Sequence, residues 1–169
     1  MLARVNSVAH IGLKSVPIEV EVDVATLGFP SFNIVGLPSK AVEEAKERVK
    51  TAIVNTGCSF PQKKITVNLA PADLAKEGSC YDLPIALGIL LASGEIVLNE
   101  EINKSLFYGE LSLDGSVRHT KGILLVAIFA KNNGFKKVFV PKQSSSEAAV
   151  VDKIHVSQTF TFLSLYIAF

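Results

Sequence analysis

The sequence predicts an α/β domain in which helices pack on one face of a mixed β-sheet. Three observations carry this prediction: strict alternation of apolar and acidic residues at 18–24, a change to helical spacing after residue 38, and strands that alternate with helices in the second half. The chain has 169 residues, 49% of them apolar and 20% charged, which is ordinary composition for one globular domain with its own core.

The N-terminal region predicts three strands. Residues 18–24 alternate between an apolar face and an acidic face, as in a strand with one solvated side. Residues 5–12 are the predicted hairpin partner of this strand, with residues 12–17 as the polar connection between them. Residues 32–36 predict a third, short strand.

The central region predicts two helices around one strand. Apolar residues at helical spacing predict a helix between an N-cap at Ser39 and a stop at Gly57. Residues 64–69 are rich in β-branched and apolar residues and predict a strand. Asp82 is expected to cap a second helix, which runs from Leu83 toward Gly94 and is apolar on every side, so we expect it to be buried.

The second half predicts a hairpin and then helices between strands. Residues 107–113 and 116–117 flank an Asp-Gly pair, which favours a tight turn. Further along the chain we expect a helix at about 122–132, a strand at 137–141, a short helix at 144–151 and a strand at 155–156.

Composition, cysteine spacing and the length of apolar stretches argue against several classes of function. Seventeen basic and sixteen acidic residues leave a net charge of +1, so any binding of nucleic acid depends on a local patch. Cys58 and Cys80 lack the spacing of a zinc site or disulfide scaffold, which favours reduced thiols and a cytoplasmic location. The first residues resemble no signal peptide, and the longest apolar stretches have about ten residues where a membrane span needs about twenty, so no membrane partner is expected.

Four ordered motifs resemble the N-terminal domain of the ComM family, also called magnesium-chelatase-like. They are Gly36-Leu37-Pro38 with the helix through Arg48-Val49, the segment 67–78, the segment 81–88 and the segment 109–115. The resemblance extends to about Val156. It implies a fold similar to the proteolytic domain of Lon proteases, within the ribosomal-protein-S5 domain 2-like superfamily. The expected domain covers residues 1–157, and residues 158–169 form an apolar C-terminal tail that departs from the family pattern.

The resemblance also implies a function for the full-length relatives. There the domain precedes a AAA+ ATPase module, related to the ChlI ATPase, in a hexameric helicase that promotes branch migration during recombination of transforming DNA. ATP and magnesium are expected only for that module, because this chain has no GxxxxGK[ST] loop to hold phosphates. We therefore expect no cofactor in this chain. The expected partners are further copies of the chain, the AAA+ module and, within a ring, DNA.

The Lon-like frame raises the question of a catalytic dyad. Alignment of residues 76–80 with the Lon nucleophile turn puts Cys80 at the nucleophile position, and Leu124 then stands where Lon has its catalytic lysine. The base is missing, so we expect no catalysis. A Lon-type peptidase with Cys80 as nucleophile, assisted by Lys76, Lys121 or a histidine, stays open as an alternative.

Two clusters of basic residues are the candidate DNA contacts. The first surrounds one helix and the loop after it, and the second follows the Asp-Gly turn; together they comprise Lys46, Arg48, Lys50, Lys63, Lys64, Arg118 and Lys121. A solvated surface is the simpler interpretation of each. Glu19, Glu21 and Asp23 share one strand face, but solvation explains them better than a metal site. A third possibility is an autonomous interaction module whose tail, Phe160–Phe169, docks a partner.

Overall fold

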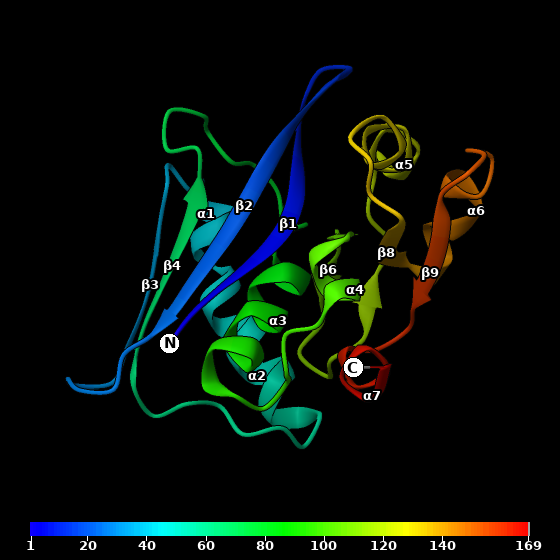
Figure 1. Ribbon diagram of the computed structural model, residues 1–169. Helices are drawn as coiled ribbons and strands as arrows, with labels where there is room; N and C mark the ends of the chain where they lie inside the picture. The colour runs from blue at the N-terminus through cyan, green and yellow to red at the C-terminus, as the bar shows by residue number, and fades with distance from the viewer. Residues whose placement is uncertain (169) are drawn as a thin grey trace.

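The computed structural model describes residues 1–168 and confirms the α/β class. Its strands fall into a four-stranded mixed sheet, a three-stranded parallel sheet and a two-stranded ribbon. Figure 1 shows the four-stranded sheet on one side of the molecule, the two smaller sheets on the other, and helices between them. The predicted strands and the buried central helix are therefore parts of one layered domain.

The four-stranded sheet contains all the strands that precede residue 71. Its order is β1 (Leu2–Ile11), β2 (Lys14–Val24), β4 (Lys64–Ala70) and β3 (Ser31–Val35). β2 is antiparallel to both neighbours, whereas β3 runs parallel to β4. Residues such as Val20, Val22 and Val67 are fully buried, while Glu19 and Asp23 on the opposite face are exposed. One face of the sheet therefore belongs to the core and the other to solvent.

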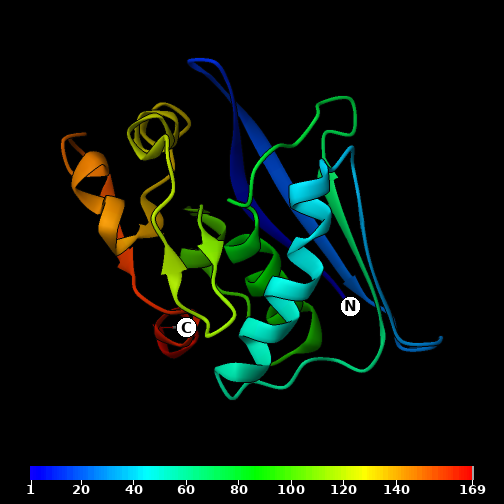
Figure 2. The same cartoon turned by 180° about the vertical axis from the view of Figure 1, so that it is seen from behind.

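Three helices cover the buried face of this sheet. α1 (Lys40–Glu43) and α2 (Ala45–Asn55) follow one another along the same side, as Figure 2 shows from behind. α3 (Asp82–Ser93) packs against β1 and β2 and is buried on every side except at its last residue. Gly88 makes this close approach possible, because a Cβ there would lie 2.5 Å from Cγ2 of Val22.

The second half of the chain forms a smaller βαβ layer. β5 (Ser105–Phe107), β8 (Lys137–Pro141) and β9 (His155–Thr159) are parallel, with β8 in the middle. α5 (Ile123–Asn132) and the short α6 (Ser145–Ala148), which follows a 3-10 turn at Lys142–Ser144, connect the strands. β6 (Glu110–Leu111) and β7 (Val117–Arg118) form the ribbon around the Asp-Gly turn. α4 (Glu100–Asn103) joins α3 to β5.

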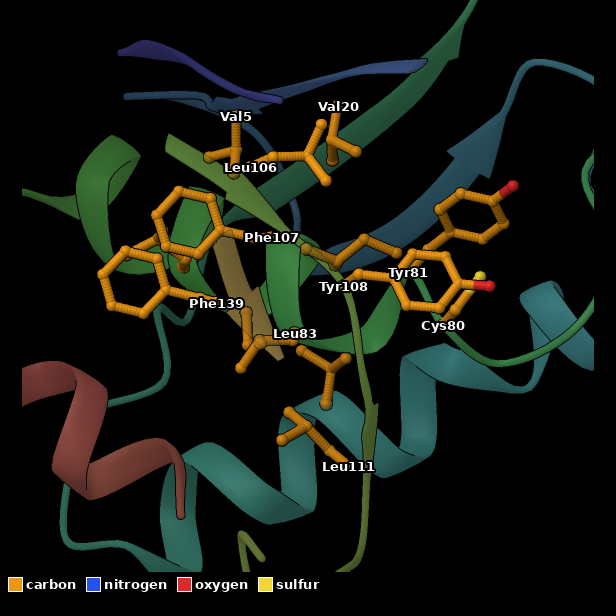
Figure 3. Packing of buried hydrophobic residues seen from close by; sticks show 14 of the residues in the cluster. Val5, Val20, Cys80, Tyr81, Leu83, Leu106, Phe107, Tyr108, Leu111 and Phe139 are labelled. Carbon is orange, nitrogen blue, oxygen red and sulfur yellow. The ribbon is translucent and has the colours of Figure 1, made fainter. Parts of the chain in front are cut away.

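The two halves share one hydrophobic core. Figure 3 shows Val5 and Val20 of the larger sheet in the same cluster as Leu83 of α3 and the stacked rings of Phe107 and Phe139. Those ring centroids are 4.7 Å apart with planes inclined by 6°. Side chains of β1 also bind the backbone of the second half, since Ser7 Oγ donates to the carbonyl oxygen of Phe107 at 2.9 Å. The residues that follow α3 are therefore firmly attached to the first half.

Several predicted element boundaries were wrong. Pro17 lies inside β2, not in the hairpin connection, which is only two residues long. The strand accepts a proline there because β2 pairs with β4 only from Glu19 onward, so one of its edges carries no ladder at residue 17. The expected single helix after Ser39 divides at Glu44. The expected strand 107–113 also divides, because β5 joins the parallel sheet before β6 begins.

The apolar C-terminal segment is partly built into the core. β9 extends to Thr159, and α7 (Phe162–Ala168) follows it. Phe162 and Leu165 are buried, while Phe160 and Leu163 are exposed. The i, i+3 spacing of the buried pair is helical, so the segment packs as an amphipathic turn. Residue 169 lies outside the described residues, and the expected boundary after residue 157 stays a prediction.

Candidate functional site

The segment between β4 and α3 forms the floor of the candidate site. Its Lys76 lies beside Pro38 in an isolated parallel bridge, and its N–H donates to the carbonyl oxygen of Leu37 at 3.1 Å. The Lys76 side chain is fully buried, and its Nζ donates to the carbonyl oxygen of Pro71. Burial lowers the pKa of this amine. Lys76 therefore stabilises the turn that leads to Cys80.

Cys80 lies at the base of a pocket of about 400 Å³. The pocket forms where the start of α3 meets the end of β1, and its lining includes Ala9, His10, Leu74, Glu77, Tyr81 and Tyr108. Figure 3 shows Cys80 beside the rings of Tyr81 and Tyr108. The expected nucleophile position is thus next to a real concavity, whose walls are tyrosines.

The Cys80 thiol is held in its protonated form. Only 5% of the residue is exposed, and this burial raises the pKa of Cys80 to about 12. The side chains of Tyr108 and Tyr81 hydrogen-bond to the thiol and lower that pKa, but they do not offset the burial. The pKa values of both tyrosines are themselves raised, chiefly by burial. The nucleophilic form of cysteine is the thiolate, which this environment disfavours.

The groups considered as a base for Cys80 do not form a dyad with it. Lys76 is hydrogen-bonded to Pro71, and Leu124 is an aliphatic side chain that is 40% exposed on α5. Lys121 contributes its carbonyl oxygen, which accepts a long bond of 3.4 Å from the Tyr108 hydroxyl.

His10 is the one candidate base that lines the pocket of Cys80. Its Nδ1 lies 3.0 Å from Oγ of Ser15, and its buried Nε2 has no hydrogen-bond partner among the described residues. Burial lowers the pKa of His10, which favours the neutral ring. A Cβ at Gly122 would lie 3.3 Å from Nε2, so the start of α5 covers this nitrogen closely. The thiol therefore has tyrosines as its partners, with the imidazole nearby.

Two residues after Cys80, Asp82 forms a buried ion pair with Arg48. Asp82, fully buried, receives Nε of Arg48 at 2.7 Å and Nη2 at 3.0 Å, and the N–H of Leu111 donates to it at 3.2 Å. Burial raises the pKa of Asp82 to about 6, although the bonds from Arg48 lower it. The position of Asp82 before Leu83 had suggested that it caps α3, and this prediction was wrong. Asp82 fixes the start of α3 to α2 and to the ribbon.

The same ion pair removes Arg48 from the group of free cations. Arg48 also donates to the carbonyl oxygen of Ala41 at 2.9 Å, so its guanidinium group is engaged in contacts within the domain. Lys46, Lys50 and Lys63, in contrast, lie together around a hollow of about 260 Å³ that Phe32 and Phe60 also line. Lys50 Nζ lies 6.0 Å from the centre of the Phe60 ring. Lys64 is exposed where β4 begins, beside the start of β3.

Arg118 of the second basic cluster lines a hollow of about 920 Å³ beside the ribbon. Arg118 Nε lies 3.8 Å from Oε1 of Glu110, whose other oxygen accepts from Ser79 Oγ. Lys142, from the turn after β8, also lines this hollow, and its Nζ is 4.1 Å from the centre of the Phe160 ring. Lys121 is exposed just before α5. The hollow therefore mixes cations with Glu110 and an aromatic ring.

Neighbouring side chains engage two of the three carboxylates on the acidic face of β2. Arg4 Nε lies 3.4 Å from Glu19 and 3.2 Å from Glu21, and Asn68 donates to Glu21 at 2.9 Å. The hydrogen bond from Asn68 is the largest cause of the lowered pKa of Glu21. Within residues 1–168, no three His, Cys, Asp or Glu side chains are grouped as a metal would require. The helices described in that range are all too short or too polar to cross a membrane.

Sequence reasoning missed most contacts of the site. Tyr81, Tyr108 and His10 come from three separate elements, and nothing in their spacing indicates that they meet at Cys80. The pairing of Arg48 with Asp82 joins residues 34 positions apart. The available signal was chemical: a carboxylate at the start of an otherwise apolar helix requires a partner when it is buried.

Comparison with known proteins identifies the family. The chain belongs to the Mg-chelatase-like family: the family model described as subunit ChlI of Mg-chelatase matches residues 20–144. It is 42% identical over 151 residues to the uncharacterized protein YifB of Escherichia coli, covering 89% of this chain and 29% of YifB. It is also 42% identical over 150 residues to the competence protein ComM of Haemophilus influenzae, covering 89% of this chain and 29% of ComM. The chain thus spans about three-tenths of the length of these curated relatives.

Proposed function

We propose that this chain is a non-catalytic oligomerisation and binding domain of a ComM-like, Mg-chelatase-related AAA+ ATPase that acts in DNA recombination and natural transformation. The observation that carries the non-catalytic role is the burial of Cys80 among tyrosines. Leu124, at the position where the resemblance expects a lysine, is aliphatic. The recombination role is supported by likeness to a relative named for competence. ATP and magnesium belong to the AAA+ module in this proposal, and the two unpaired thiols favour the cytoplasm.

The chemistry of Cys80 supports binding over hydrolysis. A pKa raised to about 12 leaves almost no thiolate at Cys80 near neutral pH. A cysteine peptidase needs a neighbouring base that removes this proton, and the two hydroxyls that bond to Cys80 have pKa values even further from neutrality. Peptide hydrolysis with Cys80 as nucleophile would therefore need a different arrangement of this pocket.

The cation-bearing hollow beside β3 supports DNA contact. Lys46, Lys50 and Lys63 line the same hollow as Glu47 and the rings of Phe32 and Phe60, whose centroids are 5.9 Å apart. Ammonium groups neutralise phosphates, and neighbouring aromatic rings suit unpaired bases. Each domain offers only a few such contacts, so the affinity of one copy is low. Copies arranged in a ring would multiply it through effective concentration.

A three-part experiment tests the proposal on the purified chain. Sedimentation velocity over a wide concentration range measures self-association, fluorescence anisotropy with single-stranded DNA at several salt concentrations measures binding, and release of labelled casein fragments measures peptidase activity. We expect association, weak salt-dependent binding and no casein turnover. Casein cleavage that Cys80→Ser abolishes would establish the peptidase alternative and overturn the non-catalytic role.

Matched variants locate the DNA contact. Lys46→Ala/Lys50→Ala removes two cations from the hollow, and Lys136→Ala/Lys153→Ala removes two exposed cations elsewhere as a control. The first variant is expected to lower the slope of log K against log salt by about two, because each phosphate contact contributes about one. Equal slopes for the two variants would remove this surface from the proposal, and no binding at low salt would remove DNA contact by the isolated domain.

A further inference from the structure

We infer that two complementary surfaces at opposite ends of this domain bind one another between copies, head to tail. One is an apolar groove between α5 and the tip of the β1–β2 hairpin, hereafter the α5 groove. The other is the acid-flanked segment Glu95–Glu101, hereafter the acidic loop. The inference rests on the proposed role in oligomerisation and specifies the contact through which that role is exercised.

The α5 groove is a hollow of about 390 Å³. Its apolar lining comes from Leu13 and Pro17 of the hairpin and from Leu125, Ile128 and Phe129 of α5, and Ser15, Asn132 and Asn133 complete it. Leu13 is 87% exposed and Ile128 is 40% exposed, and Leu124 lies one helical turn before Ile128 with the same exposure. Large apolar side chains that gather in this way mark interaction sites more often than isolated ones do.

Two lysines lie next in sequence to residues that line the α5 groove. Lys14 follows Leu13 directly, and Lys131 lies between Phe129 and Asn132, two residues that line the groove. Both lysines are exposed, and within residues 1–168 no ion pair engages either of them. The groove lining itself contains no acidic residue. The partner that fits therefore combines apolar side chains with flanking carboxylates.

The acidic loop has this combination. Val97 is 77% exposed and Leu98 is 51% exposed, where α3 gives way to α4. Glu95 precedes them and Glu100 and Glu101 follow, all with exposed side chains. Glu100 and Glu101 already pair with Lys104 and Lys137, which leaves Glu95 as the carboxylate without an ion pair in this part of the described chain. Buried Ile96 anchors the loop between these exposed residues.

Charge distinguishes the acidic loop from the other exposed apolar loop. Residues 25–30 expose Leu27 and Phe29 even more fully, at 87% and 94%. Residues 25–30 contain no carboxylate, so that loop has nothing to pair with the lysines beside the α5 groove. Complementarity therefore selects the acidic loop.

The two surfaces lie too far apart to meet within one copy. Tyr81, at the start of α3, lines a pocket with Ile11 and Gly12 at the hairpin tip, whereas the acidic loop follows the other end of that helix. Figure 1 accordingly shows the hairpin tip and α5 at the upper end and the chain leaving α3 toward the lower end. A contact between different surfaces on successive copies is heterologous, and it generates a ring when the rotation between copies closes.

A charge-swap experiment on the full chain tests this inference. Lys131→Glu and Glu95→Lys each place like charges at the contact, and both residues are exposed, so the fold should be retained. We expect each variant alone to raise the dissociation constant of self-association by about tenfold or more in sedimentation experiments. A 1:1 mixture of the two should return to within about threefold of the wild type, because every contact in an alternating assembly regains an opposite-charge pair. Lys40→Glu, on α1, is the control and should behave as the wild type.

Crosslinking gives a second readout in a Cys58→Ser background. Leu13→Cys mixed with Val97→Cys should form an intermolecular disulfide several times faster than Leu13→Cys mixed with Leu27→Cys, although Leu27 is more exposed than Val97. If the wild type associates but the charge variants do not weaken it, or if the mixture does not recover, the inference is overturned and oligomerisation stands. A wild type that stays monomeric at the highest concentration overturns the proposed oligomerisation itself, and this contact with it.

Discussion

Removal of Arg48 should destabilise the domain strongly and in a pH-dependent way. Arg48→Met keeps the length of the side chain but leaves Asp82 fully buried with only the N–H of Leu111 at 3.2 Å as its partner. The variant loses two hydrogen bonds to the carboxylate, at 2.7 and 3.0 Å. A buried charge that loses its partner costs about 3–5 kcal/mol, which is a large part of the 5–15 kcal/mol that stabilises a typical domain.

The sign of the pH dependence follows from Asp82. Its pKa is about 6 in the folded chain and close to the ordinary 3.8 when unfolded, so the folded state binds the proton more tightly. Stability therefore falls as pH rises from about 4 to about 6. Arg48 lowers the pKa of Asp82, so its loss raises that pKa further and extends the fall to higher pH. The difference between wild type and Arg48→Met should be largest near pH 8 and should shrink to under about 2 kcal/mol near pH 5.

Urea unfolding followed by circular dichroism at pH 5 and pH 8 measures these free energies. The double variant Arg48→Met/Asp82→Leu is the matched control, since it removes both charges and should be more stable at pH 8 than Arg48→Met alone. A loss below about 1 kcal/mol for Arg48→Met at pH 8, or a loss of equal size at both pH values, would refute the view that a buried carboxylate depends on this guanidinium.

Two further predictions concern the thiols and the glycines. Under native conditions at pH 8, a thiol reagent should modify half-buried Cys58 much faster than Cys80, and the two rates should converge in urea; equal native rates would contradict the raised pKa and burial of Cys80. Gly36→Ala should lower the melting temperature more than Gly88→Ala, because its Cβ would lie 2.3 Å from a backbone oxygen of β4 whereas that at Gly88 meets a valine side chain at 2.5 Å. Gly134→Ala, with φ of 76° and open space around it, is the control and should cost only about 1 kcal/mol.

The sequence predicted the elements that are long enough to show a regular pattern of apolar residues. The alternation at 18–24 identified β2, and continuous apolarity identified α3 as buried, because each pattern directly encodes the faces that enter the core. α4 was missed although Asn99 accepts from the N–H of Ile102 and two glutamates occupy the first turn. A four-residue helix is too short to show a period, so only its cap could have indicated it.

The contacts of the site could not be predicted because they join distant parts of the chain. Local reasoning assigned Asp82 to the nearest task for a carboxylate before a helix, which is capping. Its partner Arg48 lies on the polar side of the predicted helix, so it was interpreted as one more solvated cation. Similarly, the spacing around Cys80 resembles a nucleophile turn, but its protonation is determined by burial, and its tyrosine neighbours lie just before α3 and just after β5.

Leu124 bears both on the proposed lack of catalysis and on the inferred contact between copies. Leu124 stands where the resemblance places a catalytic lysine, and it is one turn from Ile128 on the exposed face of α5. A lysine there would bring a charge to the edge of the apolar α5 groove, whereas leucine extends it. In our proposal, the residue at the lysine position therefore also extends the surface that we infer to bind the next copy. If Leu124→Lys still yields no casein cleavage, a lysine at this position is not enough for catalysis, and the buried state of Cys80 is a separate barrier.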